Sequence, residues 1–247
     1  MKKIYFTLFW LATIPFLGLS QEMITPKKNL IDKKWIKNRS YQMVWTVVRD
    51  TSKMKIGVVD TKVEVAGDQI LVITAVKMNA NPSPWIDSTI VNRADLSPVY
   101  HASYNMQRDM SLHFNDVITG FYKDKAANKT TEISQKVASG YFDSNFYPML
   151  INWLPLKMGY QADFDIYDYN PKGKTGVIKA HILGVSEGKY RSSKLGERKV
   201  WVVNVSDDIS GSADSKSIYV IDQLTRQLFE QKITVGNRIM EMTLVEK

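Results

Sequence analysis

Three histidines are the residues of this chain with the clearest capacity to bind a metal or move protons. His101, His113 and His181 lack the spacing of a helical metal-binding pair, and no glutamate completes such a motif. His101 and His113 can approach each other across a hairpin that turns near Arg108, where a carboxylate would complete a metal site. We favour the simpler interpretation that these are surface histidines of paired strands, and we predict no metal and no cofactor.

Aspartates offer a second kind of chemistry. Asp163, Asp165 and Asp168 fall on or near one face of an expected strand, and paired carboxylates can act as general acid and base. The same residues are also the polar half of a regular alternation, which needs no catalytic explanation. The sequence has neither a glycine-flanked serine elbow nor a phosphate-binding glycine loop. We therefore predict no catalytic residue, and a hydrolase or isomerase that uses Asp163 and Asp165 is the third of our hypotheses.

A third group of carboxylates lies near the C-terminus. Asp207, Asp208 and Asp214 supply the oxygen ligands that calcium prefers. Their spacing does not match a calcium-binding loop, and a polar hairpin between two strands explains the same residues.

The first twenty residues have the layout of a secretory signal peptide. A basic start precedes the apolar run from Ile4 to Leu19, and cleavage is expected after Ser20. The alternative is an uncleaved anchor, but a membrane span needs ~20 apolar residues, and Pro15 interrupts this run. The chain has no cysteine, which excludes a lipid anchor on cysteine, disulfides and thiolate chemistry. We predict an exported protein, periplasmic or outer-membrane-associated, that is soluble after signal cleavage.

Residues 21–40 form a basic segment that precedes the main domain. The whole chain has a net charge of +8, and much of the excess lies between Lys27 and Arg39. A short amphipathic turn here could rest on an anionic membrane surface or contact envelope proteins. The candidates for that contact are Lys33, Lys34, Trp35 and Lys37. We favour the alternative that Trp35 packs onto the domain. Nucleic acid is not an expected partner, because the basic residues do not continue into strands rich in aromatics.

From Tyr41 to the C-terminus the hydrophobic residues alternate with polar ones, which is typical of strands with one buried face. No long helical period separates these strands, so a doubly wound α/β fold is excluded. We predict a mainly β protein: a single antiparallel meander over 41–247, curled into a half-barrel or open barrel. The expected strands cover 59–65, 70–76, 97–106, 110–114, 117–122, 130–137, 162–166, 201–205 and 240–244.

One segment breaks the alternation and predicts a short helix. Pro148 suits a first helical turn, Pro155 ends the segment, and Leu150, Trp153 and Leu154 share one face. Asp143 or Ser144 is the expected cap. We expect the helix to pack on the concave side of the sheet.

Large apolar residues are the remaining functional signal. They either line a cavity for a hydrophobic ligand or simply form the core of a β domain, and the core is the commoner arrangement. Methionine adapts to varied ligands. If there is a pocket, we expect a volume of ~300 Å³ or more, bounded near Met106, Phe114, Trp153 and Phe164. The full set of candidates for the ligand pocket is Tyr104, Met106, Met110, Phe114, Phe146, Trp153, Phe164 and Trp201.

Several short motifs resemble those of the DUF3108 family of exported bacterial proteins. The central ones are Tyr141–Asn145 and Leu154–Tyr160, and the order continues in Leu96–Tyr100, Gly196–Val203 and Tyr219–Asp222. The resemblance covers roughly residues 41–246. It implies a fold similar to the half-barrel of periplasmic lipoprotein carriers, with an apolar concave face. It implies no catalytic residue, since the family has no assigned activity. The lysine-rich composition and the end of the leader resemble proteins of the Bacteroidetes group.

These observations support two main hypotheses about function. The first is non-enzymatic binding of a hydrophobic ligand, such as a lipid or acyl chain, by an exported half-barrel. The alternative is a structural or protein-interaction component of the cell envelope that holds no small ligand.

Overall fold

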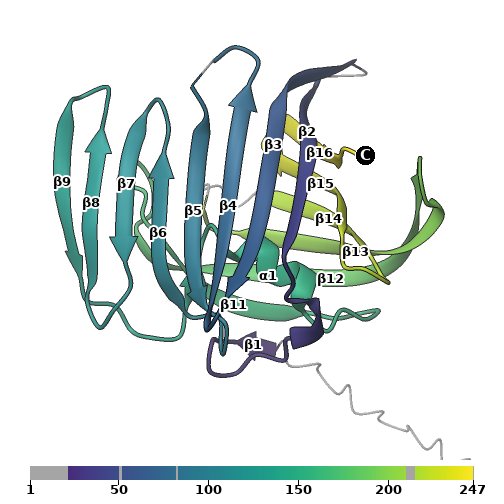
Figure 1. The fold of residues 1–247 in the computed structure, drawn as a ribbon, viewed down its shortest axis with the longest axis horizontal. Helices are drawn as coiled ribbons and strands as arrows, with labels where there is room; N and C mark the ends of the chain where they lie inside the picture. Colours follow the sequence, from purple (N-terminus) through teal and green to yellow (C-terminus); the bar gives the residue numbers. More distant parts are fainter. Residues whose placement is uncertain (1–21, 50–51, 82, 210–214, 247) are drawn as a thin grey trace, which may run out of the picture.

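The computed structural model describes residues 22–49, 52–81, 83–209 and 215–246. These residues form one curled sheet of 16 strands with a single short α-helix inside the curl (Figure 1). The sheet is open and does not close into a barrel, which confirms the predicted fold class. The expected signal peptide, residues 1–20, lies outside the described residues. Within the described part of the chain, no helix is long and apolar enough to cross a membrane.

The sheet is built from two antiparallel runs of strands that each follow the order of the chain. The first run contains β2 (Arg39–Arg49), β3 (Ser52–Ala66), β4 (Gln69–Met78), β5 (Trp85–Asn92), β6 (Pro98–Tyr104), β7 (Arg108–His113), β8 (Ile118–Asp124) and β9 (Lys129–Gln135). The second run contains β11 (Ala162–Asp168), β12 (Gly176–Ser192), β13 (Gly196–Asp207), β14 (Lys216–Asp222), β15 (Leu228–Val235) and β16 (Arg238–Leu244). The two runs meet where β16 pairs with β2, so the single meander expected from the sequence is in fact two joined meanders.

Two very short strands add parallel pairs to β11. They are β1 (Glu22–Ile24), from the basic N-terminal segment, and β10 (Phe142–Asp143), which follows the first run. The 3-10 helix η1 (Lys33–Trp35) lies between β1 and β2 and begins after Asp32, whose side chain accepts the Lys34 N–H. The basic segment is therefore tied into the sheet at its start.

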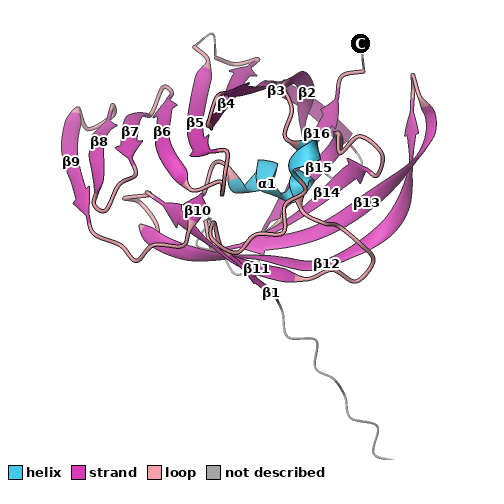
Figure 2. Ribbon diagram, turned by 60° about the horizontal axis from the view of Figure 1, so that its bottom comes forward, coloured by secondary structure: helices cyan, strands magenta, loops and turns pink. Residues whose placement is uncertain are grey.

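The chain crosses the concave face between the two runs and forms helix α1 (Tyr147–Trp153) there. Pro148 stands in the first turn, as expected, and the backbone is extended at Leu154 before Pro155. Asp143 accepts the N–H groups of Asn145 and Phe146 at 3.0 Å each, which orders the chain just before the helix. Figure 2 shows α1 inside the curl, with strands of both runs around it.

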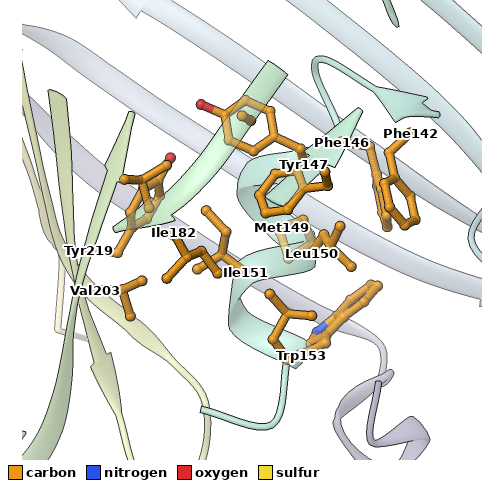
Figure 3. Packing of buried hydrophobic residues seen from close by; sticks show 14 of the residues in the cluster. Phe142, Phe146, Tyr147, Met149, Leu150, Ile151, Trp153, Ile182, Val203 and Tyr219 are labelled. Carbon is orange, nitrogen blue, oxygen red and sulfur yellow. The ribbon is translucent and has the colours of Figure 1, made fainter. Parts of the chain in front are cut away.

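The main core surrounds α1 and takes buried side chains from both runs of strands. The side chains of Phe146, Leu150, Trp153 and Phe164 are completely buried there. The Phe146 and Trp153 rings pack edge to face with their centroids 5.7 Å apart. Figure 3 shows Trp153 at one end of the helix and Tyr147 at the other.

A second, smaller core covers the β7–β9 end of the sheet. Its centre is an aromatic group in which the rings of Phe114 and Tyr141 lie 5.7 and 5.6 Å from that of Tyr167. Met110 and Leu112 of β7 are buried beneath these rings. The chain's own side chains therefore fill the concave face at this end.

Candidate functional site

A cavity of about 460 Å³ lies over α1, between β2–β5 on one side and β13–β16 on the other. Most of its wall is apolar, because the inward positions of the strands carry aliphatic, methionine and tryptophan side chains. These wall residues are Met43, Trp45, Val59, Val72, Val76, Trp85, Leu228, Ile233, Val235 and Met242. The size and the lining are those of a small-molecule pocket.

Helix α1 borders both the cavity and the core. Tyr147, Pro148, Met149 and Asn152 line the cavity, and Tyr147 and Met149 also belong to the main core. The neighbouring Leu150 and Trp153 point into the packed core, as Figure 3 shows. One short helix thus separates a filled part of the concave face from an unfilled part.

Three polar side chains form a hydrogen-bonded cluster where α1, β13 and β14 meet. The Tyr147 hydroxyl donates to the Asp207 carboxylate and is also in contact with the Tyr219 hydroxyl. Burial, together with the nearby Tyr219 and Asp207, raises the pKa of Tyr147 well above its usual value. Burial likewise raises the pKa of Tyr219. Both hydroxyls therefore keep their protons at neutral pH.

A second carboxylate stands on the opposite wall of the cavity. Asp87 of β5 is buried, and its Oδ1 accepts the indole N–H of Trp85 at 2.8 Å. Two further lining residues have a buried polar atom without a hydrogen-bond partner, Trp45 at Nε1 and Asn152 at Oδ1. The Asn152 amide is held by its Nδ2, which donates to the carbonyl of Pro148 at 3.2 Å.

A buried charged pair fastens the segment that leads into α1. His101 Nδ1 of β6 lies 2.8 Å from Asp143 Oδ2, and Thr89 donates to the same carboxylate at 3.3 Å. Burial alone would lower the pKa of His101, but the attraction and hydrogen bond of Asp143 outweigh it, so that the pKa is raised. Ser144 extends the attachment by donating to Asp168 at 2.7 Å. The Tyr141–Asn145 motif therefore joins α1 to β5, β6 and β11.

His101 corrects the interpretation of the histidines as surface residues. His101 and His113 lie on paired strands but one position out of register, so their side chains point to opposite faces. His113 is exposed and packs against the Tyr100 ring at 5.0 Å. His101 is buried because it faces the concave side, where Asp143 meets it. In the described ranges, no three histidines or carboxylates are grouped as a metal site would require.

The structure places the ligand-pocket candidates away from the cavity. Phe146, Trp153 and Phe164 fill the main core, and Trp201 packs against it. Met110 and Phe114 belong to the second core.

The two remaining candidates, Tyr104 and Met106, are exposed near the β6–β7 turn. None of the candidates is among the described residues that line the cavity.

The tryptophan of the basic segment packs onto the β domain, as we favoured from the sequence. Trp35 packs against the main core, with the Arg226 guanidinium 5.3 Å and the Lys34 ammonium 4.8 Å from its ring. Lys33 and Lys37 are exposed to solvent. Of the four candidates for membrane contact, the three lysines are therefore accessible and the indole is half-buried.

The aspartates considered for acid–base chemistry are engaged in pairs. Asp163 lies 2.6 Å from His181 Nδ1, and Asp165 lies 2.5 Å from Lys179 Nζ. Both alternate along β11 with the buried Phe164, so they face away from the cavity.

Near the C-terminus, Asp208 pairs with Lys174 at 3.1 Å, while Asp207 turns toward Tyr147. Asp214 lies outside the described residues.

A second depression lies on the outer side of the sheet. It has a volume of about 800 Å³, and the outward residues Ile73 and Ala75 of β4 contribute to its wall together with Leu195 and Phe229. Four basic residues, Lys37, Arg39, Lys62 and Lys194, also line it. Along β4 the residues of this outer groove alternate with those of the cavity, while Tyr41 and Thr61 line both.

Comparison with known proteins gives a family and a fold. The family described as "Protein of unknown function (DUF3108)" matches residues 40–243. Among solved structures, a beta-barrel-like protein of the domain of unknown function DUF1849 from Brucella abortus is similar, with a TM-score of 0.55 and 11% identity. The alignment covers 88% of this chain and 97% of that one. At this identity the likeness concerns the fold alone. No curated protein matches the chain.

Proposed function

This chain belongs to the DUF3108 family, whose function is unknown, and on that premise we propose that its β domain binds an apolar ligand in the cavity over α1. The ligand class is a lipid or acyl chain, held without chemical change. The observation that carries the proposal is the unfilled, mostly apolar cavity of about 460 Å³ over α1.

The argument rests on how little of the concave face α1 can cover. The helix has seven residues, and its bulky side chains are directed to one side. Inward aliphatic residues of β3 and β4, such as Val59 and Val76, border the space that is left. Covering that surface with an apolar molecule is favourable by roughly 25 cal/mol per Å² buried.

Binding of an uncharged fluorescent probe tests the proposal. N-Phenyl-1-naphthylamine should bind the folded protein with one site, and the variant Thr74→Trp should weaken binding at least tenfold. Thr74 lines the cavity, so the indole would occupy the space of the probe. The matched control is Ala75→Trp, because Ala75 is the next residue of β4 and lines the outer groove instead.

The two variants also separate the competing outcomes. Loss of binding in Thr74→Trp alone, with an unchanged circular dichroism spectrum, supports the cavity as the site. Loss in Ala75→Trp alone would place the probe in the outer groove and contradict the proposal. A wild-type protein that does not bind the probe at all would also contradict it.

We also propose that the protein meets its ligand outside the cytoplasm, in the periplasm or at the outer membrane. The support is the layout of residues 1–20, with a basic start, an apolar run and a small residue at the expected cleavage site. The intact mass of the protein from the envelope fraction should correspond to a chain that begins at Gln21. A mass that includes Met1 would instead indicate an anchored protein.

A protein-interaction function in the envelope is the second candidate. Ile86 and Tyr104 pair across β5 and β6 and expose apolar side chains on the outer side of the sheet. Contiguous apolar surface is typical of protein contacts. This candidate replaces the first if the probe does not bind and if Tyr104→Lys abolishes a cross-link that the wild-type protein forms in envelopes.

A further inference from the structure

We propose, on the premise that the cavity binds an apolar ligand, that the polar end of this ligand donates hydrogen bonds and carries no negative charge, with an alkylammonium group as the best fit. This inference rests on the proposed function and adds the head-group class that the site selects. It follows from the charge and the hydrogen-bonding capacity of the lining.

The charged groups of the cavity all have one sign. Among the lining residues that the structure describes, Asp87 and Asp207 are carboxylates, and none is a lysine, arginine or histidine. Neither carboxylate forms a salt bridge with any described residue. Their hydrogen-bond donors are neutral: the Trp85 indole for Asp87, and the Tyr147 hydroxyl and the Ile209 backbone for Asp207.

Two cations near this lining have partners of their own. His101 lies close enough to Asp87 to be influenced by it, but its ring is held by Asp143. Arg108 donates to Ser103 from Nε at 3.3 Å and from Nη2 at 3.2 Å. Neither residue lines the cavity. An anionic head group that entered would therefore find no positive side chain among the described residues of the wall.

Among its described residues, the lining has one unpartnered acceptor, Asn152 Oδ1, and one unpartnered donor, Trp45 Nε1. The acceptors, Asn152 and Asp207, favour a head group with N–H or O–H donors. Asn152 Oδ1 is an acceptor without a partner in a side chain that is 2% exposed. The Asp207 carboxylate has further lone pairs beyond the bonds that it accepts from Tyr147 and Ile209. A buried acceptor that gains a donor relieves an unfavourable desolvation, whereas a carboxylate placed beside Asp207 adds repulsion between like charges.

Competition between three amphiphiles of equal chain length tests the inference. Dodecylamine, dodecanol and dodecanoate are titrated below their micellar concentrations, at neutral pH, against protein that holds N-phenyl-1-naphthylamine. Dodecylamine should displace the probe at a concentration at least tenfold lower than dodecanoate, with dodecanol in between. Asp207→Asn should reduce that ratio at least threefold.

The control variant is Asp208→Asn. It removes the same charge one residue away, but Asp208 does not line the cavity and pairs with Lys174. The ratio in Asp208→Asn should stay at the wild-type value. Equal displacement by dodecanoate and dodecylamine, or an equal change in both variants, would overturn the head-group inference and leave the apolar site intact. Failure of the probe to bind would overturn the binding function itself, and the head-group inference with it.

Discussion

The two sides of helix α1 differ in how completely they are packed. On the core side, aromatic residues from the crossover segment and β11, chiefly Phe146, Trp153 and Phe164, leave no accessible surface. On the cavity side, the facing strands carry small residues such as Val59 and Thr74 together with large ones such as Trp45. The same helix and the same curled sheet thus border both a solid core and an open pocket.

The sequence left open whether its large apolar residues line a cavity or fill the core. None of the eight candidate residues lines this cavity, whose aromatic lining comes instead from other residues, including Trp45, Trp85 and Tyr147. The cavity forms where β-branched and small polar residues alternate with outward polar ones along β3 and β4. The length of α1 contributes as well, because seven residues do not reach across the whole concave face.

The largest expected effect is on the packed side. Trp153→Ala should lower the free energy of unfolding by ~3–5 kcal/mol, since it empties a fully buried aromatic position. Met149→Ala, at a position that borders the cavity on the same helix, should cost less, ~2 kcal/mol, because one side of the side chain already borders empty space. Urea titration followed by fluorescence and circular dichroism gives both values. Equal losses would mean that the two sides of α1 do not differ in packing.

An intermediate effect is expected where the crossover segment is fastened. Asp143→Asn leaves the buried His101 without its counter-charge, and breaking a buried pair in this way typically costs ~3 kcal/mol or more. The matched control is Asp163→Asn, which breaks the partly exposed pair with His181 and should cost less than ~1 kcal/mol. Thermal or chemical unfolding at pH 6 measures both. A small loss in Asp143→Asn would show that the pair does not anchor α1.

The smallest effect is a dependence of stability on pH. Because Asp143 raises the pKa of His101 above its ordinary value of 6.5, the folded state binds the proton more tightly than the unfolded state does. The pair therefore contributes fully below about pH 6.5, and its contribution is lost as the pH rises through the raised pKa. The loss should be smaller than that of Asp143→Asn, since a neutral His101 still hydrogen bonds to the carboxylate.

Two variants isolate the contribution of this histidine. His101→Gln should remove the pH dependence between pH 6.5 and the raised pKa, while His113→Gln, on the exposed face of the neighbouring strand, should leave it unchanged. Urea midpoints at several pH values give the result. An unchanged profile in His101→Gln would assign the titration to another group.

Much of the fold could be predicted from the sequence because its signals are local. Alternation over Val59–Val65 and Met240–Leu244 identified strands, and the proline before Met149 identified the helix. The pairing of β16 with β2, which joins the two meanders, leaves no local signal in the sequence. Pairing between strands so far apart in the chain depends on how the whole sheet is assembled.

The candidate site was harder to predict than the fold. Tyr41, Met43 and Trp45 alternate along β2, which indicates an inward face but does not say whether that face meets a helix or empty space. The pairing of Tyr147 with Asp207 joins residues 60 positions apart, and the position of His101 against Asp143 depends equally on the crossover. These contacts depend on tertiary packing, which cannot be predicted from the types of the residues alone.

The pairing of the last strand with the first long one has a consequence for the order of folding. The Thr46 hydroxyl of β2 donates to the Glu241 carbonyl of β16 across 195 residues, within the ladder that joins these two strands. While the chain is being synthesised, the edge of β2 that faces β16 therefore stays unpaired until β16 has been added. Contacts this distant form slowly, and an open strand edge can recruit other chains in the meantime. A chain cut off before Arg238 would leave the edges of β2 and β15 unpaired. Its cavity would also lack the part of the wall that Met242 contributes.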